Sequence, residues 1–100
     1  MKLMVTWQVH PDKRQDAFAA FAGLALDDYQ AQQGPKVKVL TRWHDVVNGR
    51  GVAVLDTTDG AALSGWLMKW HGAVDFHIAP AHDDAEAHEL ARAQHGGGAG

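Results

Sequence analysis

The sequence has 100 residues, no cysteine and a formal net charge of −3, which is the size of a single domain. Without cysteine it can form neither a disulfide framework nor a thiolate metal site. No apolar run is long enough to span a bilayer and the first residues lack a signal-peptide pattern, so we expect a cytoplasmic protein without a membrane partner. The acidic excess lies in residues 80–100, while residues 1–79 balance to zero and contain no basic stripe. Nothing therefore predicts a nucleic-acid partner.

The first two elements predicted along the chain are a strand and a helix. Residues 2–9 alternate between two sets of side chains, which is typical of a strand. Asp12 with Gln15 resembles a capping box and predicts a helix that continues to about residue 30. Its apolar stripe is formed by Phe18, Phe21, Ala22, Leu24 and Ala25.

A hairpin and a second helix follow. Residues 36–44 alternate again, with Val37, Val39, Thr41 and Trp43 on one face and Lys38, Leu40, Arg42 and His44 on the other. Asn48-Gly49 predicts a turn with positive φ at both central positions, leading into a strand over residues 51–57. Thr58 or Asp59 is expected to cap a helix that ends near Gly72.

The last elements are a strand over residues 74–79 and a C-terminal helix. Asp83 and Glu86 predict a second capping box, which opens an alanine-rich helix to about residue 94. The glycine-rich residues 95–100 are expected to be disordered. We therefore predict one domain over residues 1–94.

The order of elements predicts an α+β fold of the ferredoxin-like type, β-α-β-β-α-β with a C-terminal helix. Two helices can cover only one face of the four-stranded sheet. The other face is expected to be half polar, and it would consist of Met4, Thr6, Gln8, Lys38, Leu40, Arg42, His44, Asp75 and His77. Such a face is too apolar for a fully solvated surface.

Several segments resemble a bacterial family of unknown function, the domain-of-unknown-function family 3303 of the dimeric α+β barrel superfamily. The most specific match is Arg42-Trp43-His44-Asp45 followed by Gly49-Arg50-Gly51. The resemblance covers about residues 1–90. It implies a homodimer in which two sheets pack face to face around ligand cavities, but no particular chemistry, since that superfamily includes monooxygenases, cyclases, isomerases and haem-degrading enzymes.

His44, His77 and Arg42 are the candidate catalytic residues. On the predicted alternation all three lie on the half-polar face and point into the space between the two sheets. Histidine exchanges protons near neutral pH, and Arg42 could neutralise a carboxylate or an enolate. The alternative interpretation is that these side chains only bridge the dimer interface, with Asp75 or Asp56 as partner.

The candidate ligand-binding residues are Thr6, Trp7, Trp43, Asp56 and Trp66. The tryptophans would supply an apolar wall, with Trp7 and Trp43 packed under the helices. Asp56 is the odd residue of an apolar strand and needs a partner. A metal triad of Asp56 with His44 and His77 fits the alternation poorly, and Trp66 with His71 or His77 matches a haem site only loosely. We therefore predict no cofactor and no metal.

The function expected from these residues is binding of a small organic ligand, such as an aromatic acid, in a cavity between sheet and helices. An enzyme would use histidine acid/base chemistry without a cofactor, as in a monooxygenase, isomerase or cyclase. The alternatives are a non-catalytic binding or assembly protein whose polar sheet face forms the dimer interface, and a haem- or metal-binding protein.

Overall fold

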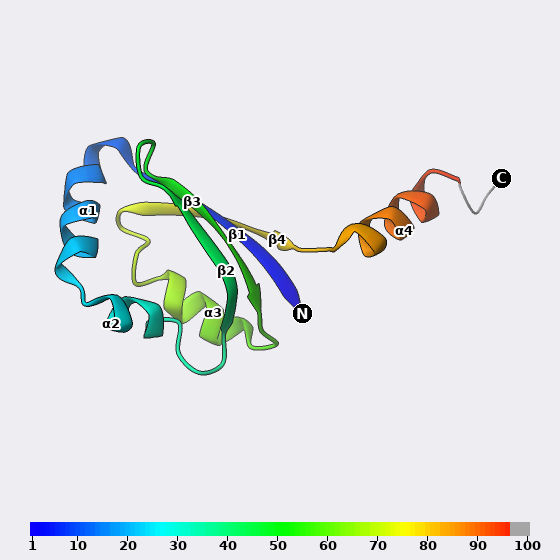
Figure 1. Ribbon diagram of the computed structural model, residues 1–100, viewed down its shortest axis with the longest axis horizontal. Coiled ribbons are helices and arrows are strands. Elements are labelled where there is room, and N and C mark those ends of the chain that lie inside the picture. The colour runs from blue at the N-terminus through cyan, green and yellow to red at the C-terminus, as the bar shows by residue number, and fades with distance from the viewer. Residues whose placement is uncertain (97–100) are drawn as a thin grey trace.

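The computed structural model describes residues 1–96 and contains one four-stranded antiparallel sheet (Figure 1). Its strands are β1 (Lys2–Val9), β2 (Lys38–Asp45), β3 (Arg50–Asp56) and β4 (Val74–Pro80). They lie in the order β2-β3-β1-β4, which is the ferredoxin-like arrangement predicted from the element order. Of the tail predicted as disordered over residues 95–100, His95 and Gly96 form a turn, and residues 97–100 lie outside the described part of the chain.

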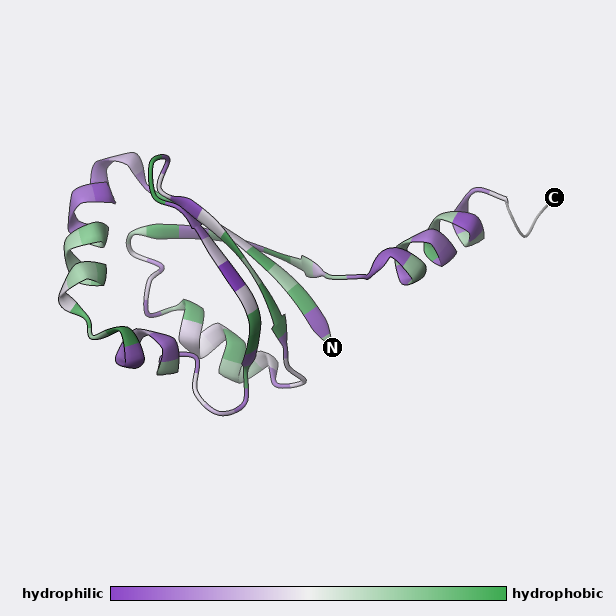
Figure 2. Cartoon of the chain, viewed as in Figure 1, coloured by the Kyte–Doolittle hydropathy of each residue, from purple (hydrophilic) through white to green (hydrophobic). Residues whose placement is uncertain are grey.

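The helices α1 (Arg14–Gly23), α2 (Leu26–Ala31) and α3 (Gly60–Leu67) lie on one side of the sheet, and α4 (Asp84–Gln94) projects away from it (Figure 1). Figure 2 shows hydrophobic and hydrophilic residues mixed along the strands, as expected for a sheet with two unlike faces. The buried core joins the helix-facing residues of the sheet to α3 and consists of Val5, Val37, Ala53, Leu55, Leu63, Trp66 and Leu67.

The single helix predicted up to residue 30 is divided in the structure. A short 3₁₀ turn, Pro11–Lys13, precedes α1, and neither it nor α1 has a side-chain N-cap, so the predicted Asp12–Gln15 capping box is wrong. The division lies at Leu24 and Ala25, whose backbones are extended. An extended pair cannot continue the i to i−4 hydrogen bonds of a helix, so α2 takes a new direction.

The other helix ends follow the predictions in part. Asp59 caps α3, where its side chain accepts a hydrogen bond of 2.9 Å from the backbone N–H of Ala62, but α3 ends at Leu67 rather than near Gly72. The capping box of Asp83 and Glu86 at the start of α4 is confirmed.

The hairpin between β2 and β3 forms, but not with the expected backbone. Only Gly49 has a positive φ, +65°, because Asn48 is held instead by Asp45. The Asp45 side chain accepts hydrogen bonds from the backbone and the side-chain amide of Asn48 and from Arg50. These bonds hold the pKa of Asp45 down, at about 2, so the loop is tied by a carboxylate that is ionised at neutral pH.

A β-bulge in β2 changes which residues of that strand face the helices. Val39 pairs with Leu55 and Thr41 pairs with Val54, so Leu40 is an extra residue without a partner on β3. One extra residue moves every following side chain to the opposite face. The prediction that Arg42 and His44 share a face with Met4 and Gln8 is therefore wrong.

Candidate functional site

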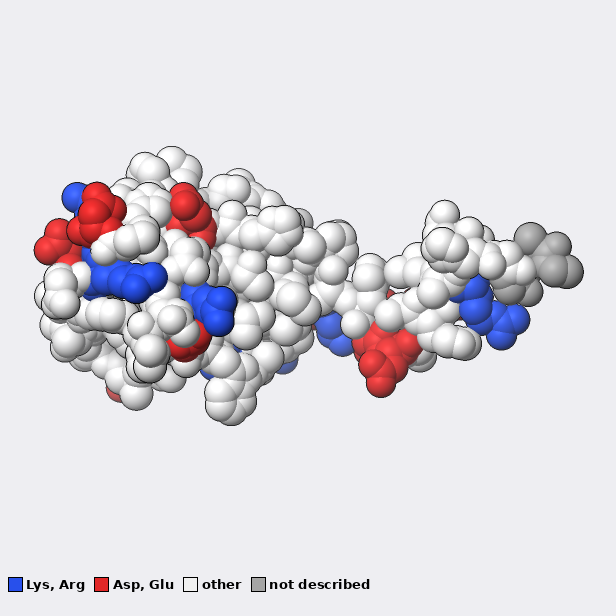
Figure 3. Space-filling view, turned by 90° about the horizontal axis from the view of Figure 1, so that it is seen from above, with Lys and Arg blue, Asp and Glu red and all other residues white. Residues whose placement is uncertain are grey.

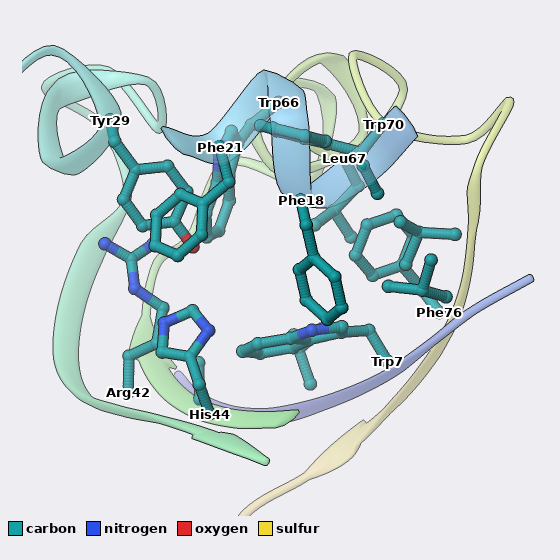
Figure 4. Close-up of a pocket in the computed structure, with 15 residues that line it drawn as sticks. Trp7, Phe18, Phe21, Tyr29, Arg42, His44, Trp66, Leu67, Trp70 and Phe76 are labelled. Carbon is teal, nitrogen blue, oxygen red and sulfur yellow. The ribbon is translucent and has the colours of Figure 1, made fainter. Parts of the chain in front are cut away.

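A cavity of about 100 Å³ lies between the helix-facing side of the sheet and helices α1, α2 and α3 (Figure 4). Its wall is mainly aromatic, with three polar side chains, Tyr29, Arg42 and His44, at one side. An apolar cavity of about 150 Å³ can hold benzene in an engineered protein. This cavity has about two thirds of that volume, but Phe21, Tyr29, Arg42 and His44 also line a second hollow, so a single ring fits if it extends toward that side. Its lining residues are Val5, Trp7, Val9, Ala17, Phe18, Phe21, Tyr29, Arg42, His44, Ala53, Trp66, Leu67, Trp70, Val74 and Phe76.

The bulge at Leu40 places Arg42 and His44 in the cavity. Arg42 pairs with Ala53 and His44 pairs with Gly51, and Ala53 and Gly51 are in turn opposite Val5 and Trp7 on β1. Residues directly opposite each other on antiparallel strands share a face. Arg42 and His44 thus lie on the same side of the sheet as the core, beneath the helices.

The floor of the cavity is the indole of Trp7, which lies against Gly51. A Cβ atom on Gly51 would be 2.1 Å from Cζ2 of Trp7 and 2.7 Å from the backbone oxygen of Trp43. Only a residue without a side chain leaves this space to the ring. Gly51 therefore determines how deep Trp7 lies.

Arg42 stacks its guanidinium on an aromatic ring rather than pairing with an acid. Its Cζ atom is 4.5 Å from the centre of the Tyr29 ring, which is a cation–π distance. Within residues 1–96, no carboxylate lies in salt-bridge range of Arg42. The donors of the guanidinium are thus free for an anion that enters the cavity.

His44 lies among aromatic rings at the side of the cavity where it meets solvent. Its imidazole stacks on the Phe21 ring, with the ring centres 5.5 Å apart and an angle of 14° between the planes. It also makes an edge contact with the Trp7 indole, with the ring centres 5.4 Å apart. Partial burial, and secondarily the positive charge of Arg42, lowers the pKa of His44 below its usual 6.5. At neutral pH the imidazole is therefore uncharged and can accept a proton.

Tyr29 completes the polar side of the cavity. Its ring contacts Phe21, with the centres 4.6 Å apart. Burial raises the pKa of Tyr29 above its usual 10, and the charge of Arg42 acts in the opposite direction. The hydroxyl therefore keeps its proton at neutral pH and can donate a hydrogen bond. The indole N–H of Trp70 cannot serve in the same way, since it donates to the side-chain oxygen of Gln32 at 2.9 Å.

Four of the predicted site residues lie on the opposite, open face of the sheet. His77 pairs with Thr6 on that face, so His44 and His77 do not share a pocket, and Thr6 lies outside the cavity. Trp43 is 71 % exposed and does not pack under the helices, because the bulge turned it outward. Asp56 also lies there, paired with the amino group of Met1 at 3.0 Å.

The metal and haem arrangements considered as alternatives do not form in the described part of the chain. His44 and Asp56 lie on opposite faces of the sheet, and residues 1–96 contain no group of three metal-ligating side chains. Trp66 belongs to the core and lines the cavity, whereas His77 is on the open face. His71 is exposed in the turns that follow α3, where it contacts the Met68 carbonyl. The loose haem match therefore has no common site.

Sequence reasoning missed Tyr29 and the cavity role of Phe18, Phe21 and Phe76. The apolar stripe did single out Phe18 and Phe21, but as core residues of one continuous helix. Tyr29 reaches Arg42 only because the chain turns at Leu24 and Ala25. The available signal was that a third aromatic residue, Tyr29, follows Phe18 and Phe21 in the segment that was predicted as one helix.

The fold and the site define an α+β protein of the split βαβ type, with an aromatic cavity that contains one arginine and one neutral histidine. The chain belongs to the family described as "Domain of unknown function (DUF3303)", whose model matches residues 1–95. Comparison with curated proteins and with solved structures gave no match. Among residues 1–96, no helix has the length and apolarity required to cross a membrane.

Proposed function

We propose that the protein binds a small organic acid of about one ring in this cavity, and that His44 exchanges a proton with the bound molecule. The observation that carries the proposal is the guanidinium of Arg42, which stacks on Tyr29, has no carboxylate partner within residues 1–96 and lies two residues from a neutral imidazole. Arg42 is partly buried and stays partly solvated, and an anionic ligand in the cavity would supply the charge-assisted hydrogen bonds that no carboxylate of the described residues provides.

Each side chain would have a separate role. Arg42 would bind the carboxylate, or the enolate oxygen that forms when a proton leaves the neighbouring carbon. His44 would take that proton, since it is uncharged at neutral pH. Tyr29 would donate a hydrogen bond to the same oxygen, and the ring of the ligand would pack against Trp7 and Phe18.

Binding is tested by titrating benzoate into the protein in a calorimeter, with benzyl alcohol as the uncharged ligand of matched size. We expect benzoate to bind and Arg42→Gln to weaken it at least about tenfold, because a charge-assisted hydrogen bond contributes about 1.5–3 kcal/mol. Arg92→Gln removes the same charge from the exposed helix α4 and should leave the affinity unchanged. Equal affinity for benzoate and benzyl alcohol, or equal losses in the two variants, would contradict an anion site at Arg42.

Proton transfer is tested with phenylpyruvate, an acid with exchangeable protons next to its carbonyl. We expect the protein to accelerate exchange of these protons with deuterated water, followed by nuclear magnetic resonance, and His44→Gln to reduce the rate at least about a hundredfold. His77→Gln is the matched control on the open face and should keep the rate. Exchange at the rate of buffer alone would contradict the catalytic part and leave binding in place.

A second proposal, assembly as a homodimer, is supported by the pattern of the open sheet face. Its two central rows are largely uncharged and include the exposed Trp43 and Met4; the rows are Trp43, Val52, Thr6 and His77, and then Thr41, Val54, Met4 and Ala79. An uncharged face of this kind is typical of a surface that is covered.

The two end rows of the same face carry opposite net charge. At the hairpin end, Asp45 and Asp75 stand against Arg50, and at the other end Lys2 and Lys38 stand against Asp56. A two-fold axis that lies between two such sheets and runs across the strands would bring each acidic end over a basic end. The open face is therefore complementary to a second copy of itself.

The oligomeric state follows from sedimentation velocity at micromolar concentration, where we expect a dimer. Trp43→Gln should weaken the dimer at least about tenfold, because Trp43 is the largest exposed apolar side chain of this face and a tryptophan that acts as an interface hot spot contributes about 2 kcal/mol or more. Met68→Gln, which also removes an exposed large apolar side chain but on the helix side, should not. A monomer in the unmodified protein would refute the dimer and leave the cavity proposal untouched.

A further inference from the structure

Helix α4 stands away from the rest of the protein (Figure 1). Every residue from Asp84 to Gln94 is exposed, and the chain reaches 56 Å along its longest axis because of this arm. The arm begins where β4 ends, beside the first residues of β1, since the N–H of Ala81 donates to the carbonyl of Lys2 at 3.0 Å. It therefore leaves the sheet at the lysine end of the open face.

An isolated helix of this length should not be stable in water. Helices shorter than about 12–15 residues are marginal alone, because nucleation costs more than a few turns return. The capping box at Asp83 contributes about 1 kcal/mol, which is a fraction of what is required. Helix α4 therefore needs a surface on which to pack.

One side of α4 is suited to packing. Ala87, Leu90 and Ala91 lie at i, i+3 and i+4, and thus on one face, and Leu90 is 48 % exposed. Figure 2 shows hydrophobic positions among the hydrophilic ones on this helix, and Figure 3 shows an acidic cluster at its start, near basic atoms at the end of the main body in this view. The opposite face contains Ala85, His88 and Arg92.

The complementary apolar surface is at the far end of the sheet. The hairpin between β2 and β3 exposes two valines, Val46 at 59 % and Val47 at 83 %. The arm leaves at the lysine end and the hairpin lies at the other end of the strands, so the two are far apart within one copy. Removing these exposed valine side chains from water would be favourable, because burial of apolar surface stabilises an association.

A face-to-face dimer brings the arm and the hairpin together. The two-fold axis that places acidic rows over basic rows runs across the strands, so it sets the hairpin end of one copy over the lysine end of the other. The start of each arm then lies at the hairpin end of the second copy but on its β4 side, because such an axis places each strand over its own equivalent and β1 separates β4 from the β2–β3 hairpin. Adjacent strands are about 4.8 Å apart and α4 has 11 residues, which is about 16 Å of helix, so α4 is long enough to cross to the two valines. The alternative axis, parallel to the strands, would place acidic rows over acidic rows and leave the valines uncovered.

We propose that α4 docks on a second copy of this chain, with Leu90 packed against Val46 and Val47 of that copy's hairpin. The inference rests on the homodimer proposed above, and it goes further by assigning the C-terminal helix as the segment that clasps the two copies. The helix gains the tertiary contacts that its length demands, and the valines of the hairpin are covered.

The absence of cysteine from the sequence allows a direct test by disulfide formation. Chains with Leu90→Cys are mixed with isotope-labelled chains with Val47→Cys, exchanged through the monomer and oxidised mildly. We expect a disulfide between one labelled and one unlabelled chain, at a yield at least about tenfold above that of Ala85→Cys mixed with Val47→Cys. Ala85 lies on the opposite face of α4, so it is the matched control.

Hydrogen exchange on the unmodified protein provides the second readout. We expect the α4 amides to exchange at least about tenfold more slowly at concentrations where the protein is dimeric than after dilution to monomer, and Leu90→Gln to abolish the difference. A dimer with unprotected α4 amides, or equal disulfide yields from residues 85 and 90, would overturn the docking of α4 and leave the dimer. Protection that persists in the monomer would place α4 on its own copy and overturn it as well. A chain that never dimerises would overturn both proposals.

Discussion

Replacing Gly51 with alanine tests whether the backbone of β3 determines the floor of the cavity. The new Cβ would be 2.1 Å from Cζ2 and 2.6 Å from Cε2 of Trp7. Ordinary contact begins at about 3.4 Å, so the indole would have to move by about 1.3 Å, the difference between 3.4 and 2.1 Å. The same Cβ would be 2.7 Å from the carbonyl oxygen of Trp43, which is held in the sheet.

The free energy of unfolding that Gly51→Ala loses has two sources, the displacement of the Trp7 indole and the close contact with the Trp43 backbone. Forcing extra volume into a packed region typically costs about 1–3 kcal/mol, and the contact with the Trp43 backbone places Gly51→Ala toward the upper end of that range. A loss of 1 kcal/mol lowers the melting temperature of a domain of 60–100 residues by about 4–8 °C. We therefore expect a decrease of at least about 8 °C.

The assay is thermal unfolding followed by circular dichroism, together with the benzoate titration. Gly65→Ala is the matched control, since a Cβ on that helical glycine would meet nothing within 4 Å; it should raise stability by up to about 1 kcal/mol. Benzoate affinity should fall in Gly51→Ala, because the displaced indole enters the cavity, and should persist in Gly65→Ala. A melting temperature within 2 °C of the unmodified protein for Gly51→Ala, with unchanged affinity, would refute this account of the cavity floor; the 2 °C bound is about a quarter of the expected shift.

Three further predictions concern single side chains. The pKa of His44 is lower in the folded protein than its usual 6.5, so the unfolded state binds the proton more readily and the stability of the fold decreases as the pH falls below about 6.5. In His44→Gln the melting temperature should therefore depend less on pH in that range. Identical pH dependence in the variant and the unmodified protein would contradict this prediction. Tyr29 is the sole tyrosine, so ultraviolet absorbance during a pH titration should show its phenolate forming with a midpoint above pH 10. In Arg42→Gln the midpoint should be higher still, because the charge of Arg42 lowers the pKa of Tyr29. A lower midpoint in the variant would be inconsistent with the stacked pair. Asp59→Ala removes the acceptor for the Ala62 N–H and should cost about 1 kcal/mol in urea unfolding, and no change would mean that water replaces the cap.

Most of the secondary structure could be predicted from the sequence, because strand alternation and helix capping depend on residues that are close together in the chain. The alternation of β1 and β4 placed their side chains on the correct faces, since a strand without a bulge keeps a period of two. The capping residues Asp59 and Asp83 were found because a side-chain oxygen at that position satisfies free N–H groups of its own helix.

The candidate site was predicted less well, and one residue accounts for most of the difference. Arg42 and His44 were identified from their chemistry, but they were grouped with His77, which lies on the other face. Leucine is an ordinary residue type within a strand, so nothing in the sequence indicates that Leu40 is the extra residue of the bulge. Trp43 was placed under the helices for the same reason.

The sequence by itself determined the order of the elements, the α+β class and the residue types available for chemistry, because periodicity, capping and turn residues act within a few positions of each other. Only the tertiary structure decided which face of β2 lines the cavity and that Tyr29 stacks on Arg42. Pairing in β2 depends on β3 and on the helices packed above it, so the energy that places the bulge at Leu40 comes from contacts with residues distant in the chain.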